Sequence, residues 1–569
     1  MSVKVNMIRR LSKILRSDSL KPLIENNNNN NILHDGYDME GNGYNGPMAP
    51  GIFSLEEEKC PQPQVISLQD LAEILQVAPD AVSCSSSDNE EQVCLIVPPE
   101  PTQKNRKQVV HLMQISAMQH FPKPPADLNQ NLMEHLEEMH KAMFNELVRL
   151  GPLLDSLGLT ECLIECYHCQ MFTHLDNLLP NISSAQNFFL LMDWVQKVYQ
   201  SQELLGHPDF QDLDLIKKVD PQLLTAWQAN ATKHLLEKVQ EEVRKSLENI
   251  LQNERTQERC DTEEDYVGLY VDTIQCVAAM PNYALKISSQ LSDQVQEVCF
   301  QQLLIFVKRY STEQTNSLER KAKMDKPQTI HFFKTLKTCK ELKQHFEPEG
   351  EGIRTSLLKG TAETLEVMET FTVKLLMDTA AKMTEKHLKA YFKTHNKQFS
   401  VFLDALKSFF PEPTYCQDVR ETVMGEAYEI IVRIYIKRLI KTRKRNLKKH
   451  WSPDADVGDT VAKDAQLLHD TILALAPEVR NWNHLLLNIK EVLDCTNTET
   501  IKIPVAIMQQ KWLTNSREDL LLLRTLLQWK GLSRRDVKKV LAALPSDHQT
   551  RARSRPWYCC LNCYCGPQL

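Results

Sequence analysis

The chain has 569 residues and a net charge of −7, and its 42% hydrophobic and 25% charged residues are typical of a globular protein with a sizeable core. Its 16 glycines are far fewer than the ~7% of an average protein, which argues against a sheet protein with many tight turns. The 16 cysteines lie beside no secretory signal and no run approaches about 18 apolar residues, so we expect a reduced, cytosolic protein without a membrane-spanning segment.

The first 24 residues predict a short basic amphipathic helix. Residues 2–17 hold five cations and no acid, and their apolar residues fall on one helical side. Such a helix suits an anionic membrane surface, where each cation contributes about 1 kcal/mol. A disordered basic tail without a partner is the alternative. The predicted membrane-binding residues are Lys4, Arg9, Arg10, Lys13 and Arg16.

Residues 25–126 are predicted to be a disordered linker. Six asparagines at 26–31, a serine run at 83–87 and several proline pairs leave little to bury. Two stretches in this segment, 68–77 and 109–119, could form transient helices.

At Asp127 the pattern changes to helical periodicity, and the longest stripe spans residues 220–257. Asp220 and Pro221 supply an N-cap and a proline at the first helical position. At 1.5 Å per residue this helix would run roughly 55 Å. Its apolar face consists of Leu224, Trp227, Ala231, Leu235, Val239, Val243, Leu247 and Ile250.

Further helices are predicted throughout residues 127–545, and strand alternation is never sustained. They include 128–150, 160–179, 184–205, 265–280, 283–323, 328–346, 361–395, 399–410, 414–449, 460–475, 479–494, 500–513, 517–529 and 533–543. The predicted fold class is all-α: an elongated rod of stacked helical bundles with a disordered N-terminal region. We expect an N-terminal bundle over 127–260, a middle bundle over 261–413, a C-terminal bundle over 414–545 and a cysteine-rich tail over 546–569.

Three cysteines and two histidines could be metal ligands or core side chains. Cys162, Cys166 and Cys169 lie inside a predicted helix with His168 and His174. No second Cys/His pair follows at the spacing of a zinc finger, so we favour core packing. The chain also lacks phosphate-loop, dinucleotide, zinc-protease and nucleophile-elbow motifs, and we therefore expect no enzyme, no metal and no cofactor.

A dense basic cluster ends the predicted helix 414–449. It holds eight cations in 13 residues without an acid, and cations at a helix C-terminus complement the macrodipole. The cluster could meet an acidic protein or an anionic lipid, or it could be a solvated helix end. Nucleic acid is disfavoured because no aromatic residues are interleaved for stacking. The predicted partner-binding residues are Lys437, Arg438, Lys441, Arg443, Lys444, Arg445, Lys448 and Lys449.

The tail combines arginines, Trp557, Tyr558 and four cysteines within seven residues. This composition suits reversible acylation at a membrane, and an end without a role is the alternative. A four-thiolate metal site would be cramped at this spacing. The possible acylation sites are Cys559, Cys560, Cys563 and Cys565.

Six blocks in the C-terminal third carry a resemblance to a known family. They are residues 426–439 (EAYEIIVRIYIKRL), 463–470 (KDAQLLHD), 475–477 (LAP), 489–493 (IKEVL), 519–523 (DLLLL) and 531–533 (GLS). In this order they resemble the exocyst component 3 (Sec-six) family, and within it the M-Sec branch. The likeness covers roughly residues 127–545.

The resemblance implies stacked helical bundles, association with exocyst subunits, SNARE interaction and a role in exocytosis. For the M-Sec branch it also implies membrane protrusions and tunnelling nanotubes formed with a Ral-type small GTPase. It further implies an N-terminal basic segment on phosphoinositides, which Lys4 to Arg16 match by type and position, and a basic C-terminal partner surface, for which Lys437 to Lys449 are our candidate.

Our leading hypothesis is therefore a non-enzymatic tether or adaptor, cytoplasmic and peripheral at the plasma membrane. A cytosolic signalling scaffold that works independently of the exocyst is the alternative.

Overall fold

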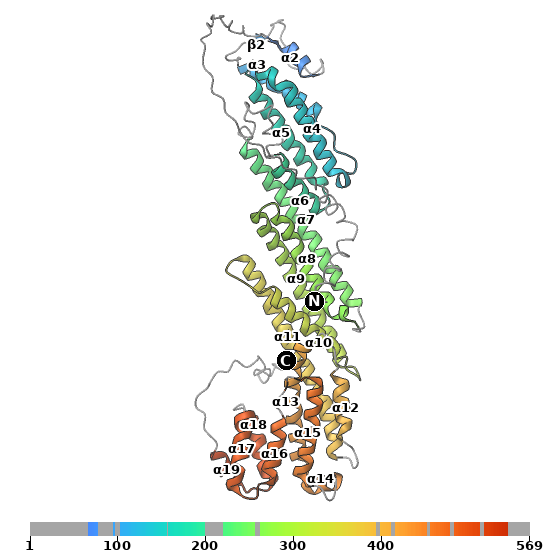
Figure 1. Cartoon of the computed structure of the whole chain (residues 1–569), viewed down its shortest axis with the longest axis vertical. Helices are drawn as coiled ribbons and strands as arrows, with labels where there is room; N and C mark the ends of the chain where they lie inside the picture. Colours follow the sequence, from blue (N-terminus) through green and yellow to red (C-terminus); the bar gives the residue numbers. More distant parts are fainter. Residues whose placement is uncertain are drawn as a thin grey trace, which may run out of the picture. The chain divides into compact units, whose positions relative to one another are not determined.

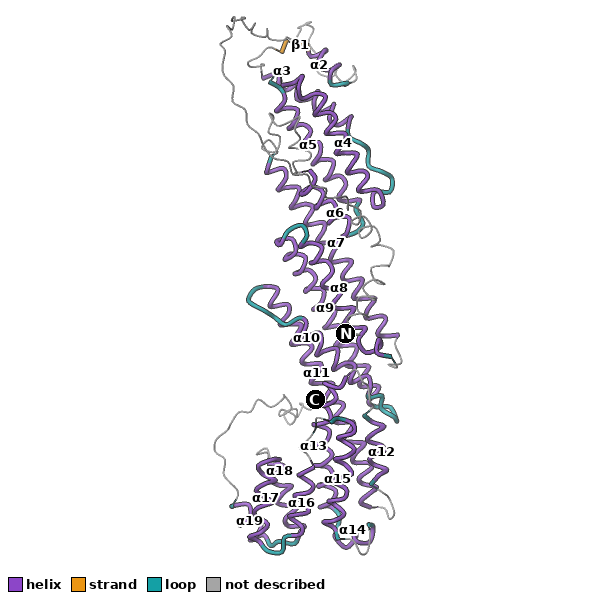
Figure 2. Tube along the Cα trace, viewed as in Figure 1, coloured by secondary structure: helices purple, strands orange, loops and turns teal. Residues whose placement is uncertain are grey.

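A computed structural model of the chain describes residues 66–77, 95–96, 103–155, 158–199, 220–256, 262–393, 399–410, 416–451, 456–477, 479, 483–512 and 517–543 (Figure 1). The chain divides into two units, residues 1–62 and 63–569, and every described residue belongs to the second. Within this unit nearly all described residues are helical (Figure 2).

The first described elements fall within the segment for which we expected disorder. A ladder pairs β1 (Ile66–Ser67) with β2 (Leu95–Ile96). Helix α2 (Leu68–Ile74) lies between the two strands in the chain, and α3 (Gln103–His120) follows them. Helix α3 packs against α5, and buried side chains of α2 and α3 join the first hydrophobic core. The expectation of disorder does not hold for 68–74 and 103–120, because these weakly apolar helices find a partner face that their own sequence does not reveal.

Helices α4 (Leu128–Asp155), α5 (Thr160–Leu178) and α6 (Ala185–Trp194) follow. A 3-10 turn at Leu179–Asn181 and a π-helical turn at Val195–Tyr199 extend the last two. We expected the first of these helices to close at Gly151-Pro152, but α4 continues past both residues. Leu150 and Leu154 are fully buried on either side of them, and this burial outweighs the hydrogen bond that Pro152 cannot donate.

Helix α7 (Pro221–Thr256) confirms the long apolar stripe. The Asp220 carboxylate accepts a hydrogen bond from the Gln222 backbone N–H at 2.8 Å, as expected of an N-cap. The stripe's last buried residue is Leu251, whereas the predicted Ile250 is only half-buried.

The next helices are α8 (Glu263–Leu285), α9 (Ser289–Ala322), α10 (Ile330–His345), α11 (Ile353–Lys393) and α12 (Ser400–Phe409). The boundary between α8 and α9 lies later than predicted, because α8 runs through Pro281. The Ser288 hydroxyl accepts a hydrogen bond from the Leu291 backbone N–H at 3.1 Å and caps α9.

The C-terminal helices are α13 (Gln417–Lys441), α14 (Lys444–His450), α15 (Val457–Leu475), α16 (Asn483–Asp494), α17 (Thr498–Trp512), α18 (Arg517–Lys530) and α19 (Arg534–Ala542). The single helix predicted over 414–449 is wrong, because Thr442 and Arg443 adopt extended backbone angles between α13 and α14. The Trp529 indole N–H donates to the Thr442 carbonyl at 2.8 Å, so a side chain from α18 satisfies a carbonyl freed by the break.

Among the described residues, buried apolar side chains form two hydrophobic cores. The first core gathers side chains from α2 to α11, and the second gathers side chains from α8 to α19. Helices α10 and α11 contribute to both: Cys339 and Met368 lie in the first core, and Phe333 and Leu376 in the second. The predicted all-α fold of stacked bundles is confirmed for this unit (Figure 1), whereas the division into three bundles stays a prediction.

Candidate functional site

The predicted basic cluster lies where α13 ends and α14 begins. Tyr435 and Leu439 are fully buried on the inner face of α13, so Lys437 and Lys441 project outward and are exposed. Helical periodicity therefore anchors α13 through its apolar residues and turns these two cations to the surface.

The short helix α14 is seated on the second core. Leu447 is fully buried, and Trp451 stacks on Tyr391 of α11 with ring centroids 5.6 Å apart. A basic segment held by an apolar residue and an aromatic stack is a folded surface with a defined place for its cations.

Two cations of the cluster are engaged within the protein. Arg438 forms an ion pair with Glu385 of α11 at 2.9 Å. The Lys444 ammonium donates to the Lys530 carbonyl at 2.8 Å and lies 5.1 Å from the centre of the Trp529 ring, in cation–π geometry. Both residues therefore attach the cluster to neighbouring helices, and their charges are less available to a partner.

The other cations of the cluster divide into two groups. Four of them are exposed: Lys437, Lys441, Arg443 and Arg445. Lys448 and Lys449 belong to α14, but their side chains lie outside the described part of the structure.

Sequence reasoning missed four further cations at this end of the chain. Arg534, Arg535, Lys538 and Lys539 are exposed on α19. The available signal was their density, four cations in six residues, next to an apolar pair with helical spacing. We predicted a site only at the longest run of cations and therefore did not predict this shorter one.

A buried carboxyl group lies beneath the basic segment. Asp464 of α15 accepts hydrogen bonds from the hydroxyls of Tyr391 (α11) and Tyr435 (α13), both at 2.7 Å. Burial raises the pKa of Asp464 to about 7, although the two tyrosine hydroxyls act in the opposite direction. Since Tyr391 also stacks on Trp451, this three-helix contact supports the end of α14.

The cysteines and histidines of α5 are mainly core side chains. Cys162, Cys166, His168 and His174 are buried, whereas Cys169 is exposed. Burial raises the pKa of the Cys166 thiol to about 12, and its Sγ lies 3.8 Å from the Val110 carbonyl, as expected of a buried, protonated cysteine. Within the described residues, no group of three or more potential ligands is arranged around a common metal position.

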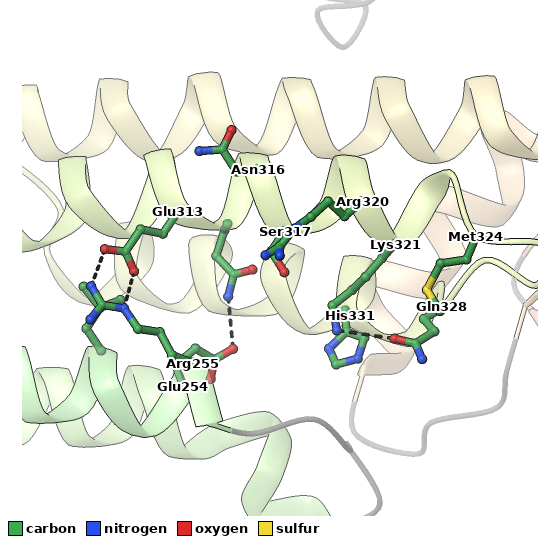
Figure 3. A pocket seen from close by; sticks show the side chains of 12 residues that line it. Glu254, Arg255, Glu313, Asn316, Ser317, Arg320, Lys321, Met324, Gln328 and His331 are labelled. Carbon is green, nitrogen blue, oxygen red and sulfur yellow. Dashed lines mark hydrogen bonds and ion pairs between the residues drawn. The ribbon is translucent and has the colours of Figure 1, made fainter.

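A cavity of about 800 Å³ lies between α7, α9 and the start of α10 (Figure 3). Its acids are engaged by cations: Glu313 with Arg255 of α7, and Glu254 with Lys334 of α10 at 2.6 Å. Burial, together with the nearby Lys321 and Lys334, lowers the pKa of His331 in the cavity wall to about 4. These ion pairs join α7, α9 and α10 at the boundary between the two cores. We therefore interpret the cavity as part of the structural junction between these helices.

Two predicted sites cannot be placed. The membrane-binding residues Lys4 to Arg16 and the possible acylation sites Cys559 to Cys565 lie outside the described residues. Among the helices that are described, none combines the length and apolar character needed to cross a membrane.

Comparison with known proteins establishes the family. The family model described as exocyst complex component Sec6 matches residues 63–411, which is more than half of the chain. The chain belongs to the Sec6 family. The match begins at residue 63 and so includes α2 and α3, which we had assigned to a linker, and it ends before the C-terminal blocks on which we noticed the resemblance.

Two individual relatives are consistent with this Sec6-family assignment. Tumor necrosis factor alpha-induced protein 2 of Mus musculus is 22% identical over 376 residues, which cover 63% of this chain and 53% of that protein. The chain therefore matches about half the length of this curated relative. The crystal structure of M-Sec superimposes with a TM-score of 0.52 at 17% identity, covering 79% of this chain and 80% of that one, and shows that the fold is shared.

Proposed function

We propose that this Sec6-family chain is a non-enzymatic tether or adaptor in exocytosis that works with exocyst subunits. The observation that carries the proposal is the family match over residues 63–411. The stacked helices support it, because helices that bury their apolar faces along their length provide a stiff scaffold.

The scaffold is continuous between its two cores. Helix α11 has 41 residues, which corresponds to roughly 60 Å, and it contributes buried side chains to both cores. A helix that packs into both cores connects them rigidly, as a tether requires.

We assign the partner-facing role to the exposed cations of the cluster, Lys437, Lys441, Arg443 and Arg445. Exposed charges of one sign speed the encounter with a partner of opposite sign and align it. A Ral-type small GTPase, SNAREs and exocyst subunits are the proposed protein partners. The proposed membrane contact is the N-terminal segment with Lys4, Arg9, Arg10, Lys13 and Arg16 on phosphoinositides, and the proposed setting is the cytoplasmic side of the plasma membrane, where protrusions and nanotubes form.

Proximity labelling in cells tests the proposal. Full-length protein is compared with the triple variant Lys441→Glu, Arg443→Glu, Arg445→Glu, and with a control in which the exposed Lys308, Lys326 and Lys359 are changed to Glu. We expect exocyst subunits among the labelled proteins for the wild type and the control, and a marked loss of labelled partners for the triple variant. Absence of every exocyst subunit and SNARE from the wild-type sample would instead favour a cytosolic scaffold.

A further inference from the structure

The cations of α19 are connected to the basic cluster by contacts around the end of α18. Trp529 of α18 donates to the Thr442 carbonyl, and Lys444 donates to the Lys530 carbonyl, each at 2.8 Å. From Lys530 the chain turns at Gly531, whose φ of +116° suits glycine, and α19 begins three residues later. These contacts bring the start of α14 beside the end of α18, almost ninety residues later in the sequence. Helices α14 and α19 lie at the same end of the C-terminal bundle, on different sides of it (Figure 1).

Helix α19 has one apolar side and one cationic side. Val537 and Val540 are buried in the second core, and the four cations Arg534, Arg535, Lys538 and Lys539 are exposed. The single acid of the helix, Asp536, is used locally, because its carboxylate accepts a hydrogen bond from the Ser533 hydroxyl at 2.6 Å. With four cations against this one acid, α19 keeps an excess of positive charge on its exposed side.

The placement of Arg534 and Arg535 is unfavourable for the isolated helix. They occupy the first two positions of α19, where the macrodipole disfavours positive charge. An external anion at this end would remove that disadvantage. The cations alone indicate a surface that binds anions. Their distribution over several elements indicates which kind of anion binds there.

The exposed cations come from several elements: the end of α13, the start of α14 and the whole of α19. Among the described residues, none of Arg443, Arg445, Arg534, Arg535, Lys538 and Lys539 forms an ion pair. The exposed side of α19 carries its four cations and no exposed large apolar residue, whereas the centre of an interface with a folded protein is apolar. A fluid layer of anionic headgroups can adjust to cations spread over several helices, and each long side chain can reach a separate headgroup.

We propose that α14, the C-terminal end of α18 and α19 form one surface for the anionic face of a phosphoinositide-containing membrane. The four α19 cations contact headgroups, and Arg443 and Arg445 border this surface and stay assigned to the protein partner. Lys444 and Trp529 are positioning residues that hold the two halves together. This inference rests on the proposed function only in using part of the same basic cluster. It adds a folded membrane site in the C-terminal bundle to the N-terminal segment.

Vesicle sedimentation with the full-length chain tests this surface. All proteins carry Arg9→Glu, Arg10→Glu and Lys13→Glu, which remove the contribution of the N-terminal segment. The test variant changes Arg534, Arg535, Lys538 and Lys539 to Gln, which preserves helix propensity. The control changes the exposed Lys308, Lys326, Lys359 and Lys382 to Gln and therefore alters the net charge equally.

With vesicles of phosphatidylcholine, phosphatidylserine and phosphatidylinositol 4,5-bisphosphate, we expect the test variant to bind at least about ten-fold more weakly than the control. We also expect no protein to bind phosphatidylcholine alone. Equal binding by the test and control variants would overturn the inference. So would an absence of vesicle binding by the N-terminal variant when exocyst subunits still co-purify with it, and that result would leave the proposed function standing.

The positioning role has a separate readout. Lys444→Gln should reduce vesicle binding about five-fold and increase hydrogen exchange at residues 442–450, whereas Lys444→Arg should restore both, because arginine keeps the cation–π contact and the donor. Equal loss of binding in Lys444→Gln and Lys444→Arg would contradict it.

Discussion

The two cores of this chain bury polar groups of opposite kinds. In the first core, His168 contacts the Tyr199 hydroxyl and His135 lies 2.9 Å from His174, and burial lowers the pKa of His168 and of His174 to about 4. In the second core, Asp464 lies between two tyrosine hydroxyls, and burial raises its pKa to about 7. Burial favours the neutral form in both places, but the neutral form is deprotonated for histidine and protonated for aspartate.

The two cores should therefore respond oppositely to pH. The contribution of the buried histidines to stability is present above pH 6.5 and is lost as the pH falls toward 4, because the unfolded chain then binds the additional protons. The contribution of Asp464 is complete below pH 3.8 and is lost as the pH rises through about 7, because the folded chain holds the additional proton. Mild acid therefore weakens the buried histidine contacts of the first core and favours the neutral Asp464 of the second.

The largest effect is expected where the two cores meet. Lys334 of α10 and Glu254 of α7 form a buried ion pair, with the two side chains 3% and 11% exposed. Changing Lys334 to Met leaves Glu254 buried without this cation and should lower the free energy of unfolding by about 3–5 kcal/mol, measured by urea denaturation.

A double variant provides the control for this pair. Lys334→Met combined with Glu254→Gln removes both charges and should recover most of the lost stability. The exposed pair Lys502–Glu499 offers a second control, since Lys502→Met should cost less than about 1 kcal/mol. Equal losses for Lys334→Met and Lys502→Met would show that the junction does not depend on its ion pair.

The next effect concerns the second core. Asp464→Asn keeps the size of the side chain and cannot ionise, so it should raise stability at pH 8 by up to about 4 kcal/mol and change it little at pH 4. Hydrogen exchange of peptides from α13 and α15, followed over this pH range, is the measurement. An unchanged pH dependence in the variant would mean that Asp464 is ionised in the folded protein at neutral pH.

The smallest of the three effects belongs to the first core. The double variant His168→Leu, Tyr199→Phe removes both partners of a buried contact, which avoids leaving one unsatisfied. Between pH 6.5 and pH 4, protonation of His168 should lower the free energy of unfolding of the wild type by about 3 kcal/mol. The double variant should not show this loss. Hydrogen exchange in α5 reports the result, and peptides from α15 should behave as in the wild type.

The fold was predictable from the sequence wherever a helix carries its own apolar stripe. The stripe from Trp227 to Leu247 is sufficient to define α7, and Ser184 and Ser533, which begin two of the predicted helices, each cap a helix in the structure. Helix α3 was expected only as a transient helix over 109–119, because its few apolar residues, among them Val109 and Met113, become a core only against α5. Tertiary contact of this kind leaves little trace in local periodicity.

The candidate site was only partly predictable, for a related reason. The run of cations from Lys437 to Arg445 is visible in the sequence, but the break at Thr442 depends on Trp529, which lies 87 residues further along the chain. In the sequence the eight cations are indistinguishable. In the structure, Arg438 forms an ion pair and Lys444 a cation–π contact, which separates these two from the exposed cations of the cluster. The relation of α19 to this cluster follows from those same contacts.

The sharing of α10 and α11 between the two cores limits how the chain can be shortened. A polypeptide that ends within Ile353–Lys393 keeps part of α11 and loses the helices that cover its remaining apolar residues. Such a fragment would present uncovered Leu and Phe side chains and would be a substrate for chaperones and proteases. A truncated allele or splice product with its boundary there should therefore behave as a loss of the whole protein, and a partial tether is not the expected outcome.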